Sequence, residues 1–364
     1  MLEEQNNSKG ANQMKMMKCL ELPHGMAPYR CPVNGLSDVY EWKTGKRIPE
    51  YLLHDSRLGC KVISGPGMTP SPMVFFGEGE IGRRDYRFWK DKLGYRMIEG
   101  EDQPFAKTVR QLRQLIDEGI PVILFGLDLY HLPYHQQFYH QVHIPGHVNL
   151  MVGYDDESVY LHDNDREGVQ AISYLDLEKA WADGYMGFSK RNTYFGIDMA
   201  RPNPDIRGIL RTAFGETAAA FLTPAGDFTG EKGYLLLVRK LEEWAGQPAT
   251  DQLKQICEHL VTFTASVIPE LPGRLLRFQT GVVNPHRAGR DTFASALRQW
   301  EPEYGDGTWI RAADCFEKSG LLMERATNII ADAVLAGNYA ALQECVPLFE
   351  KVRELETEAF GYWV

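Results

Sequence analysis

The chain has 364 residues, of which 44% are hydrophobic and 24% are charged, a composition typical of a globular protein of one or two domains. No apolar run approaches the roughly 18–20 residues that a membrane-spanning helix needs, and the polar residues 1–18 lack the apolar block of a secretory signal. The net charge of −10 argues against non-specific binding to nucleic acid, whose phosphates repel an acidic surface. We therefore expect a cytoplasmic protein with neither nucleic acid nor membrane as a partner.

The cysteines are scattered along the chain, without a CxxC pair or even spacing. This pattern predicts reduced thiols in a cytoplasm rather than a disulfide framework. The six positions are Cys19, Cys31, Cys60, Cys257, Cys315 and Cys345.

The predicted elements change in character near residue 200. Short apolar runs between Gly/Pro-rich connections predict strands at 73–76, 121–125, 148–154 and 159–161, and helical spacing predicts helices at 32–42 and 108–118. Beyond residue 202 only helices are predicted, at 206–221, 232–244, 251–267, 291–300, 309–336 and 339–360. We therefore expect a flexible N-terminus over 1–19, an α+β catalytic-type domain over 20–200 and an all-helical C-terminal domain over 201–364.

Cys31 lies at the predicted start of the first of these helices. Pro32 follows it, and proline is favoured at the first helical position because its missing N–H would be unpaired there. Cys31 would then be the helix N-cap, where the positive end of the helix dipole stabilises a thiolate. The alternative is a buried cysteine that merely precedes a helix.

Residues 146–163 predict a β-hairpin that turns around Asp155 and Asp156. Pairing back from this turn brings His147 opposite the region of Asp163, with paired Cβ atoms about 4.5–5.5 Å apart. A carboxylate there can orient the imidazole and stabilise its charged form, and a histidine that faces a thiol can activate it. Cys31, His147 and Asp163 are therefore a candidate catalytic triad, in which the contact between Cys31 and His147 is inferred.

The helix-initiating cysteine and the distant hairpin that ends in Asp resemble the papain-like arrangement of bacteriocin-leader peptidases. The run at 128–135 (DLYHLPYH), followed by the hairpin, resembles more closely the butirosin biosynthesis protein H-like family. Members of that family carry a papain-like N-terminal domain followed by a helical C-terminal domain, and residues 309–325 resemble the latter. One departure is that Arg30 precedes Cys31, where family members often have histidine.

The resemblance implies an amide-forming acyltransferase of antibiotic or other secondary-metabolite biosynthesis. An acyl group would pass from the phosphopantetheine arm of an acyl or peptidyl carrier protein to Cys31, and from there to a small amine. His147 would be the general acid and base, Asp163 would orient it, and no cofactor would be bound. The backbone N–H of Cys31 is a candidate donor to the oxyanion. A cysteine peptidase or amidase with the same triad, and a non-catalytic binding protein of that fold, remain open alternatives.

Five histidines crowd into residues 131–147. No cysteine or carboxylate accompanies them at a familiar ligand spacing, so we expect no metal site. The loop is a candidate substrate-facing segment, or merely a solvated one. Its candidate contact residues are Tyr134 and His135, joined by Asn149, which shares a strand face with His147.

A basic cluster in this acidic chain is the candidate docking surface for a carrier protein, which presents an acidic helix. The ordinary alternative is a solvated helix face. We name it the basic cluster, and its residues are Arg83, Arg84, Arg87 and Lys90.

Overall fold

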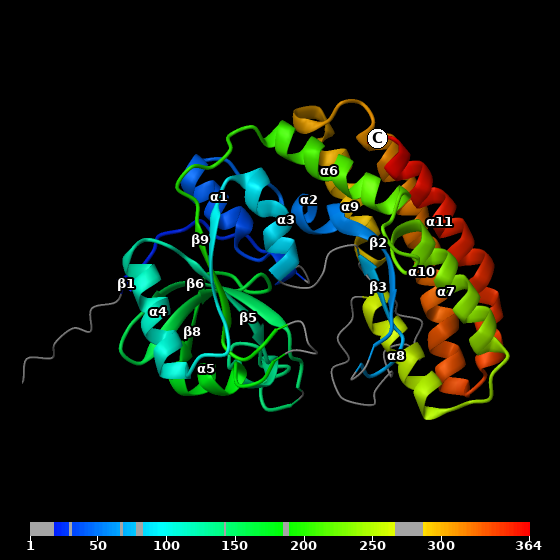
Figure 1. The fold of residues 1–364 in the computed structure, drawn as a ribbon, viewed down its shortest axis with the longest axis horizontal. Helices are drawn as coiled ribbons and strands as arrows, with labels where there is room; N and C mark the ends of the chain where they lie inside the picture. Colours follow the sequence, from blue (N-terminus) through cyan, green and yellow to red (C-terminus); the bar gives the residue numbers. More distant parts are fainter. Residues whose placement is uncertain are drawn as a thin grey trace, which may run out of the picture.

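The computed structural model describes residues 18–28, 31–65, 68–77, 83–141, 143–184, 189–265 and 287–364. Most of the N-terminal segment that we expect to be flexible lies outside these ranges. Figure 1 shows two halves side by side, a β-sheet flanked by helices and a bundle of long helices that holds the C-terminus.

The first half is built on one antiparallel sheet. Its strands lie in the order β4-β9-β5-β6-β7-β8, and β1 pairs with the end of β6. Alternate side chains of a strand point to opposite faces, so residues of β6 enter two different cores. The strands are β1 (Lys18–Cys19), β4 (Arg96–Gly100), β5 (Val122–Leu127), β6 (His147–Tyr154), β7 (Ser158–His162), β8 (Val169–Ser173) and β9 (Thr193–Asp198).

Helices cover both faces of this sheet. On one face α1 (Leu36–Thr44) and α3 (Arg83–Leu93) pack over Val148 and Leu150, and this core continues into the helical half. On the other face α4 (Phe105–Asp117) and α5 (Tyr174–Ala180) pack over Met151. α4 buries Leu112, Leu115 and Ile116, the i, i+3, i+4 stripe from which a helix at 108–118 is predicted.

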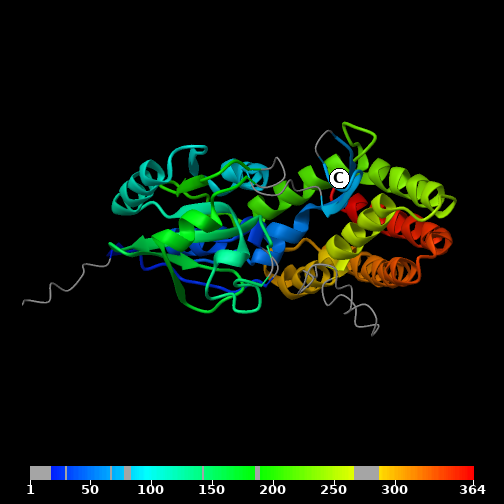
Figure 2. The same cartoon turned by 90° about the horizontal axis from the view of Figure 1, so that it is seen from below.

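The second half is a bundle centred on the long helix α10, which packs against α8, α9 and α11. Figure 2 shows α11 running alongside α7 on one side and α10 on the other, at the end of the molecule away from the sheet. The helices are α6 (Ile206–Leu222), α7 (Gly230–Ala245), α8 (Asp251–Ala265), α9 (Arg290–Tyr304), α10 (Trp309–Ala336) and α11 (Val346–Gly361).

Short elements connect and cap these helices. They are α2 (Glu50–His54) and the 3-10 turns η1 (Cys31–Val33), η2 (Asp55–Arg57), η3 (Leu129–His131), η5 (Arg287–Gly289) and η6 (Tyr339–Cys345).

A two-stranded hairpin from the first half of the sequence belongs in space to the helical bundle. Strands β2 (Leu58–Ile63) and β3 (Met73–Gly77) pack against α7 and α8 (Figure 1). The fully buried Arg290 donates to the carbonyl oxygens of Phe76 and Gly59 and forms an ion pair with Glu356 on α11. The C-terminal half is therefore helical in its own sequence but carries a small sheet from residues 58–77.

The predicted fold class, an α+β half followed by a helical half, is confirmed, with two corrections to element boundaries. The helix expected at 32–42 begins only at Leu36, because Gly35 takes the left-handed conformation (φ 81°) at its N-cap. The helix expected at 339–360 is divided into η6 and α11, where Pro347 lies in the first turn of α11. Among the described residues, no helix is both long and apolar enough to cross a bilayer.

Candidate active site

The hairpin of β6 and β7 contains a bulge that changes which residues face one another. Next to the turn Gly153 pairs with Tyr160, but beyond the bulge Leu150 pairs with His162. Val152 is thus the additional residue in β6. A bulge shifts the register by one residue, and such a shift exchanges the two faces of the strand.

This shift puts Asp163 on the face of the hairpin that carries His147. If the ladder ran without the bulge, Asp163 would lie opposite Leu150, whose side chain enters the α1 core. With the bulge, the continued ladder brings Asp163 opposite Asn149, and Asn149 shares its face with His147 because they are two residues apart. The side-chain contacts agree, since both His147 and Asn149 bond to Asp163.

His147 and Asp163 form a buried ion pair. Nε2 of His147 lies 2.7 Å from Oδ2 of Asp163, and the two residues are 6% and 0% exposed. Burial disfavours the charged imidazole, but the charge and hydrogen bond of Asp163, together with Cys31, raise the pKa of His147 well above its usual value. Burial also opposes ionisation of Asp163, yet His147 and His135 hold its pKa well below the usual range. The arrangement therefore favours an imidazolium at His147.

Cys31 completes the predicted triad. Its thiol is a hydrogen-bond partner of His147 and contributes to the raised pKa of that imidazole. Because Nε2 of His147 is engaged with Asp163, Nδ1 is the ring nitrogen left for the thiol. Cys31 is half-buried at the head of η1, not at the N-cap of α1 as expected.

Asn34 ties the turn that carries Cys31 to β6 and β7. Its Nδ2 donates to the carbonyl oxygens of Val148 (3.0 Å) and His162 (3.1 Å), which adjoin His147 and Asp163 in sequence. Its backbone N–H bonds to the carbonyl of Cys31, closing the turn. The Asn34 amide thus fixes the turn that carries Cys31 against the strands that carry His147 and lead to Asp163.

The residues expected to face substrate are directed at Asp163 instead. His135 donates to Oδ2 of Asp163 at 2.9 Å, and Asn149 donates to the same oxygen at 2.8 Å. The Tyr134 hydroxyl bonds to Oδ1 of Asn149. His135 and Asn149 are 1% and 0% exposed, so they orient the carboxylate from behind the site.

Two groups of side chains in the described part of the chain lie close enough to hold a metal ion, and one is His135, His147 and Asp163. Nδ1 of His135 lies 3.0 Å from Nη2 of Arg166, which can only donate. The proton of His135 is therefore on Nε2, where it is donated to Asp163. No lone pair of His135 faces the carboxylate, so this group does not fit a metal ion.

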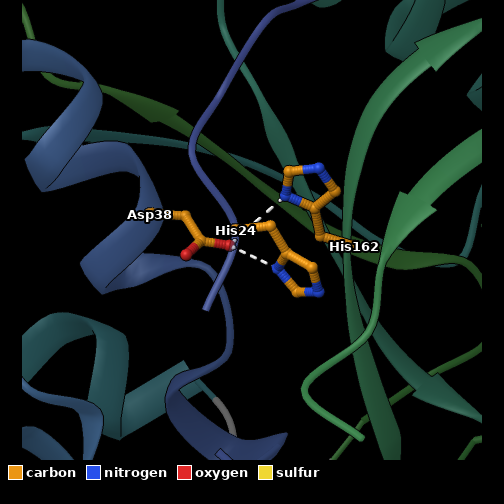
Figure 3. Close-up of side chains that lie close together, drawn as sticks. All are labelled: His24, Asp38 and His162. Atoms are coloured by element: carbon orange, nitrogen blue, oxygen red, sulfur yellow. Dashed lines mark hydrogen bonds and ion pairs between the residues drawn. The ribbon is translucent and has the colours of Figure 1, made fainter. Parts of the chain in front are cut away.

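The second group, His24, Asp38 and His162, lies on the opposite face of β7 (Figure 3). Nδ1 of His24 lies 3.0 Å and Nδ1 of His162 3.3 Å from Oδ2 of Asp38. Nε2 of His24 donates to the carbonyl of Arg166 at 2.9 Å. Burial lowers the pKa of His24, but the bonds to Asp38 and Arg166 outweigh it and raise the pKa.

A protonated His24 accounts for the contacts in this group better than a bound metal ion does. The other oxygen of Asp38 is held by Nη2 of Arg47 (2.8 Å) and the backbone N–H of Gly25 (3.1 Å). A dication would add to the guanidinium charge on a single carboxylate. His24 as an imidazolium instead satisfies both Asp38 and the Arg166 carbonyl. His162, which is buried and bonded to Asp38 on α1, belongs to this structural group rather than to the candidate site.

The basic cluster is largely paired with acidic side chains of the same chain. Arg83 forms ion pairs with Glu99 and Glu101, and Arg87 pairs with Glu99 at 3.0 Å. Lys90 lies 3.7 Å from Asp91. Arg84 also has an interaction partner. The net positive charge of this surface is therefore smaller than the sequence suggests.

Sequence patterns did not indicate Asn34, Arg166, His24 or Asp38. These residues are distant in sequence from their partners, and none belongs to a recognisable motif. The only available signal was that Asn34 and Asp38 are polar residues beside the apolar residues Val33, Leu36 and Val39.

Comparisons with known proteins place this site in a family. Residues 30–164 match the N-terminal domain of butirosin biosynthesis protein H, and residues 175–267 match a domain of unknown function, DUF4872. No curated protein sequence matches the chain. Among solved structures, a putative C39-like peptidase from Bacillus anthracis is similar at 17% identity, covering 52% of this chain and 100% of that chain with a TM-score of 0.35.

A cysteine in the first helical turn, with histidine and aspartate on adjoining antiparallel strands, is the papain-like arrangement predicted above. The matched N-terminal domain contains all three triad positions, and the DUF4872 match begins 11 residues after it. These matches support the butirosin biosynthesis protein H-like family, with its N-terminal domain over residues 30–164 followed by the DUF4872 match over residues 175–267.

Proposed function

We propose that this protein is an amide-forming acyltransferase that uses Cys31 as its nucleophile. The acyl donor would be a carrier-protein thioester and the acceptor a small amine. The observation that carries the proposal is the hydrogen-bonded series Cys31–His147–Asp163, with its aspartate fully buried.

In the first step the Cys31 thiolate attacks the thioester carbonyl. The tetrahedral intermediate collapses as the C–S bond to the carrier breaks, and the departing thiolate takes the proton of His147. In the second step the amine attacks the acyl–cysteine while neutral His147 accepts its proton. The Cys31 thiolate leaves, and the starting ion pair is restored with one amide formed. The N–H of Cys31, at the head of η1, is our candidate oxyanion donor.

Transfer rather than hydrolysis is supported by the family, which is named for biosynthesis, and by the burial of the base. His147 is only 6% exposed, which limits the access of competing water. Arg83 and Arg87 now pair with Glu101 and Glu99. The acidic side chains of a carrier that docked on the basic cluster would have to displace these two glutamates.

The test is to incubate the protein with acyl-carrier thioesters and a panel of small amines, and to quantify amide and free acid by mass spectrometry. We expect amide with the wild type and none with Cys31→Ala. Cys19→Ala is the matched control, because Cys19 is also half-buried. Free acid alone would support a hydrolase, and the absence of both products with an unmodified Cys31 would support a binding protein.

A further inference from the structure

Two histidines compete for the same oxygen of Asp163. Nε2 of His135 and Nε2 of His147 lie 2.9 and 2.7 Å from Oδ2. Either ring could in principle hold the positive charge that this buried carboxylate stabilises. Only a charge on His147 serves the chemistry, because only His147 contacts the Cys31 thiol.

Arg166 distinguishes the two rings. Its Nη2 lies 3.0 Å from Nδ1 of His135, on the side of the ring away from Asp163. A guanidinium only donates, so this nitrogen must keep its lone pair. His135 is thereby restricted to its neutral form, with the proton on Nε2.

We propose that Arg166 is a positioning residue that keeps His135 uncharged, so that the positive charge facing Asp163 is carried by His147. The titratable and charged groups facing His135 are Asp163, His147, Tyr134 and Arg166. Of these, Asp163 alone favours a charged His135, whereas burial, His147 and Arg166 lower the pKa of that ring.

Arg166 is itself held firmly in place. Its Nε donates to the carbonyl of Tyr134, and its Nη2 also reaches Oε1 of Gln137, so the guanidinium fastens the 134–137 loop to the end of β7. Its own carbonyl accepts from His24, which bonds in turn to Asp38 on α1 (Figure 3). The cluster around Asp38 therefore supports Arg166 from the opposite side.

The inference rests on the proposed thiol chemistry of Cys31, but not on the identity of the donor or acceptor. The test is therefore the rate of Cys31 alkylation by iodoacetamide as a function of pH, which needs no acyl substrate. In Arg166→Met, His135 can take a second proton. The positive charge of His135 then offsets the negative charge of Asp163, so the imidazolium of His147 is less stable. The Cys31 thiolate that pairs with this imidazolium is protonated more readily, and alkylation slows at acid pH.

We expect the acid midpoint of the Arg166→Met profile to rise by about one pH unit, which is about tenfold in rate on the acid limb, with equal rates near pH 8. Arg166→Lys, which keeps a charged donor, should restore most of the wild-type profile. Arg96→Met is the matched control, because Arg96 is an exposed arginine paired with Asp198.

The double variant Arg166→Met/His135→Gln removes the competing titration while keeping an N–H donor for Asp163. It should return the acid midpoint to the wild-type value. A profile of Arg166→Met that superimposes on the wild type, or a uniform fall at all pH values that the double variant shares, would overturn the proposal. If the proposed thiol chemistry itself were wrong, the wild type would show it, because iodoacetamide would alkylate Cys31 no faster than Cys19.

A measurement on the unaltered protein covers the case in which these variants fail to fold. Nitrogen NMR of histidine-labelled protein should show that the His135 ring, assigned by its loss in His135→Gln, stays neutral with its proton on Nε2 throughout the active pH range, as the ring of His259 does. Two charged rings coupled to Asp163 would overturn the proposal.

Discussion

His135 meets His147 edge to face, with ring centroids 5.2 Å apart at 84°, and both rings bond to the same oxygen of Asp163. Asn149 donates to that oxygen as well, and the backbone N–H of Asp165 donates to the other. Four donors therefore satisfy one fully buried carboxylate. These bonds hold the carboxylate in position, and in the proposed mechanism its negative charge stabilises the His147 imidazolium.

Asp163→Asn should lower turnover by about 10³- to 10⁴-fold, because a neutral amide cannot stabilise the His147 imidazolium. It should also cost stability, since the new NH₂ group would face the N–H of Asp165 or the donors at Oδ2. Turnover and thermal unfolding measure the two effects. Asp165→Asn is the neighbouring control, and near-normal turnover in Asp163→Asn would remove Asp163 from the mechanism.

Asn34→Leu should destabilise the protein by about 1–3 kcal/mol, because it removes the side-chain donor from two buried carbonyl groups. It should also slow alkylation of Cys31, because the cysteine turn loses its tie to β6 and β7. Asn203→Leu is the control, since Nδ2 of Asn203 also bonds a carbonyl, that of Lys92, away from the site. A similar effect of both variants on the thiol would show that Asn34 has no specific part in placing Cys31.

The titration of the buried His259 imidazole should lower the free energy of unfolding in mild acid. Burial lowers the pKa of this imidazole to about 4, and its Nε2 donates to the carbonyl of Val74, which holds β3 on α8. Below the unfolded pKa of about 6.5, the unfolded chain binds the proton more readily. Stability is therefore lost as the pH falls from about 6.5 to 4, by about 3 kcal/mol.

His259→Gln keeps a donor for Val74 but does not titrate. Urea unfolding at several pH values should show a shallower loss of stability in this variant between about pH 6.5 and 4. Parallel curves for the two proteins would count against the lowered pKa.

The basic cluster can be tested in both directions. Glu99→Gln with Glu101→Gln releases Arg83 and Arg87 from their internal partners, and should lower the KM for a carrier-bound donor if the carrier docks there. Reversal of Arg83, Arg84 and Arg87 to glutamate should raise it, with the effect weakening as salt is added. A short thioester without a carrier is the control donor. Equal changes with both donors, or no change with either, would exclude this surface as the docking site.

The sequence was sufficient for features that depend on neighbouring residues. The stripe of α4, the hairpin after His147 and the three triad positions follow from local patterns, and the structure brings the triad together. The start of α1 was misplaced because the proline signal at 32 outweighed Gly35, whose left-handed conformation ends the preceding turn.

Other features depend on contacts that no local pattern encodes. The bulge at Val152, which selects the face of Asp163, has one local signal, Gly153 within the strand run, and that glycine alone does not fix which way the register shifts. Arg166 acts on a loop about 30 residues away, and the hairpin at 58–77 packs on helices that follow it by more than 150 residues. Such pairings appear only once the chain has folded.

The most direct test of the account is the intact mass of the protein after brief exposure to an acyl-carrier thioester without an amine. We predict a single acyl adduct that peptide mapping assigns to Cys31, that is absent in Cys31→Ala and that disappears when an amine acceptor is added with formation of the amide. An adduct on another thiol, or amide formation by Cys31→Ala at the wild-type rate, would contradict the account.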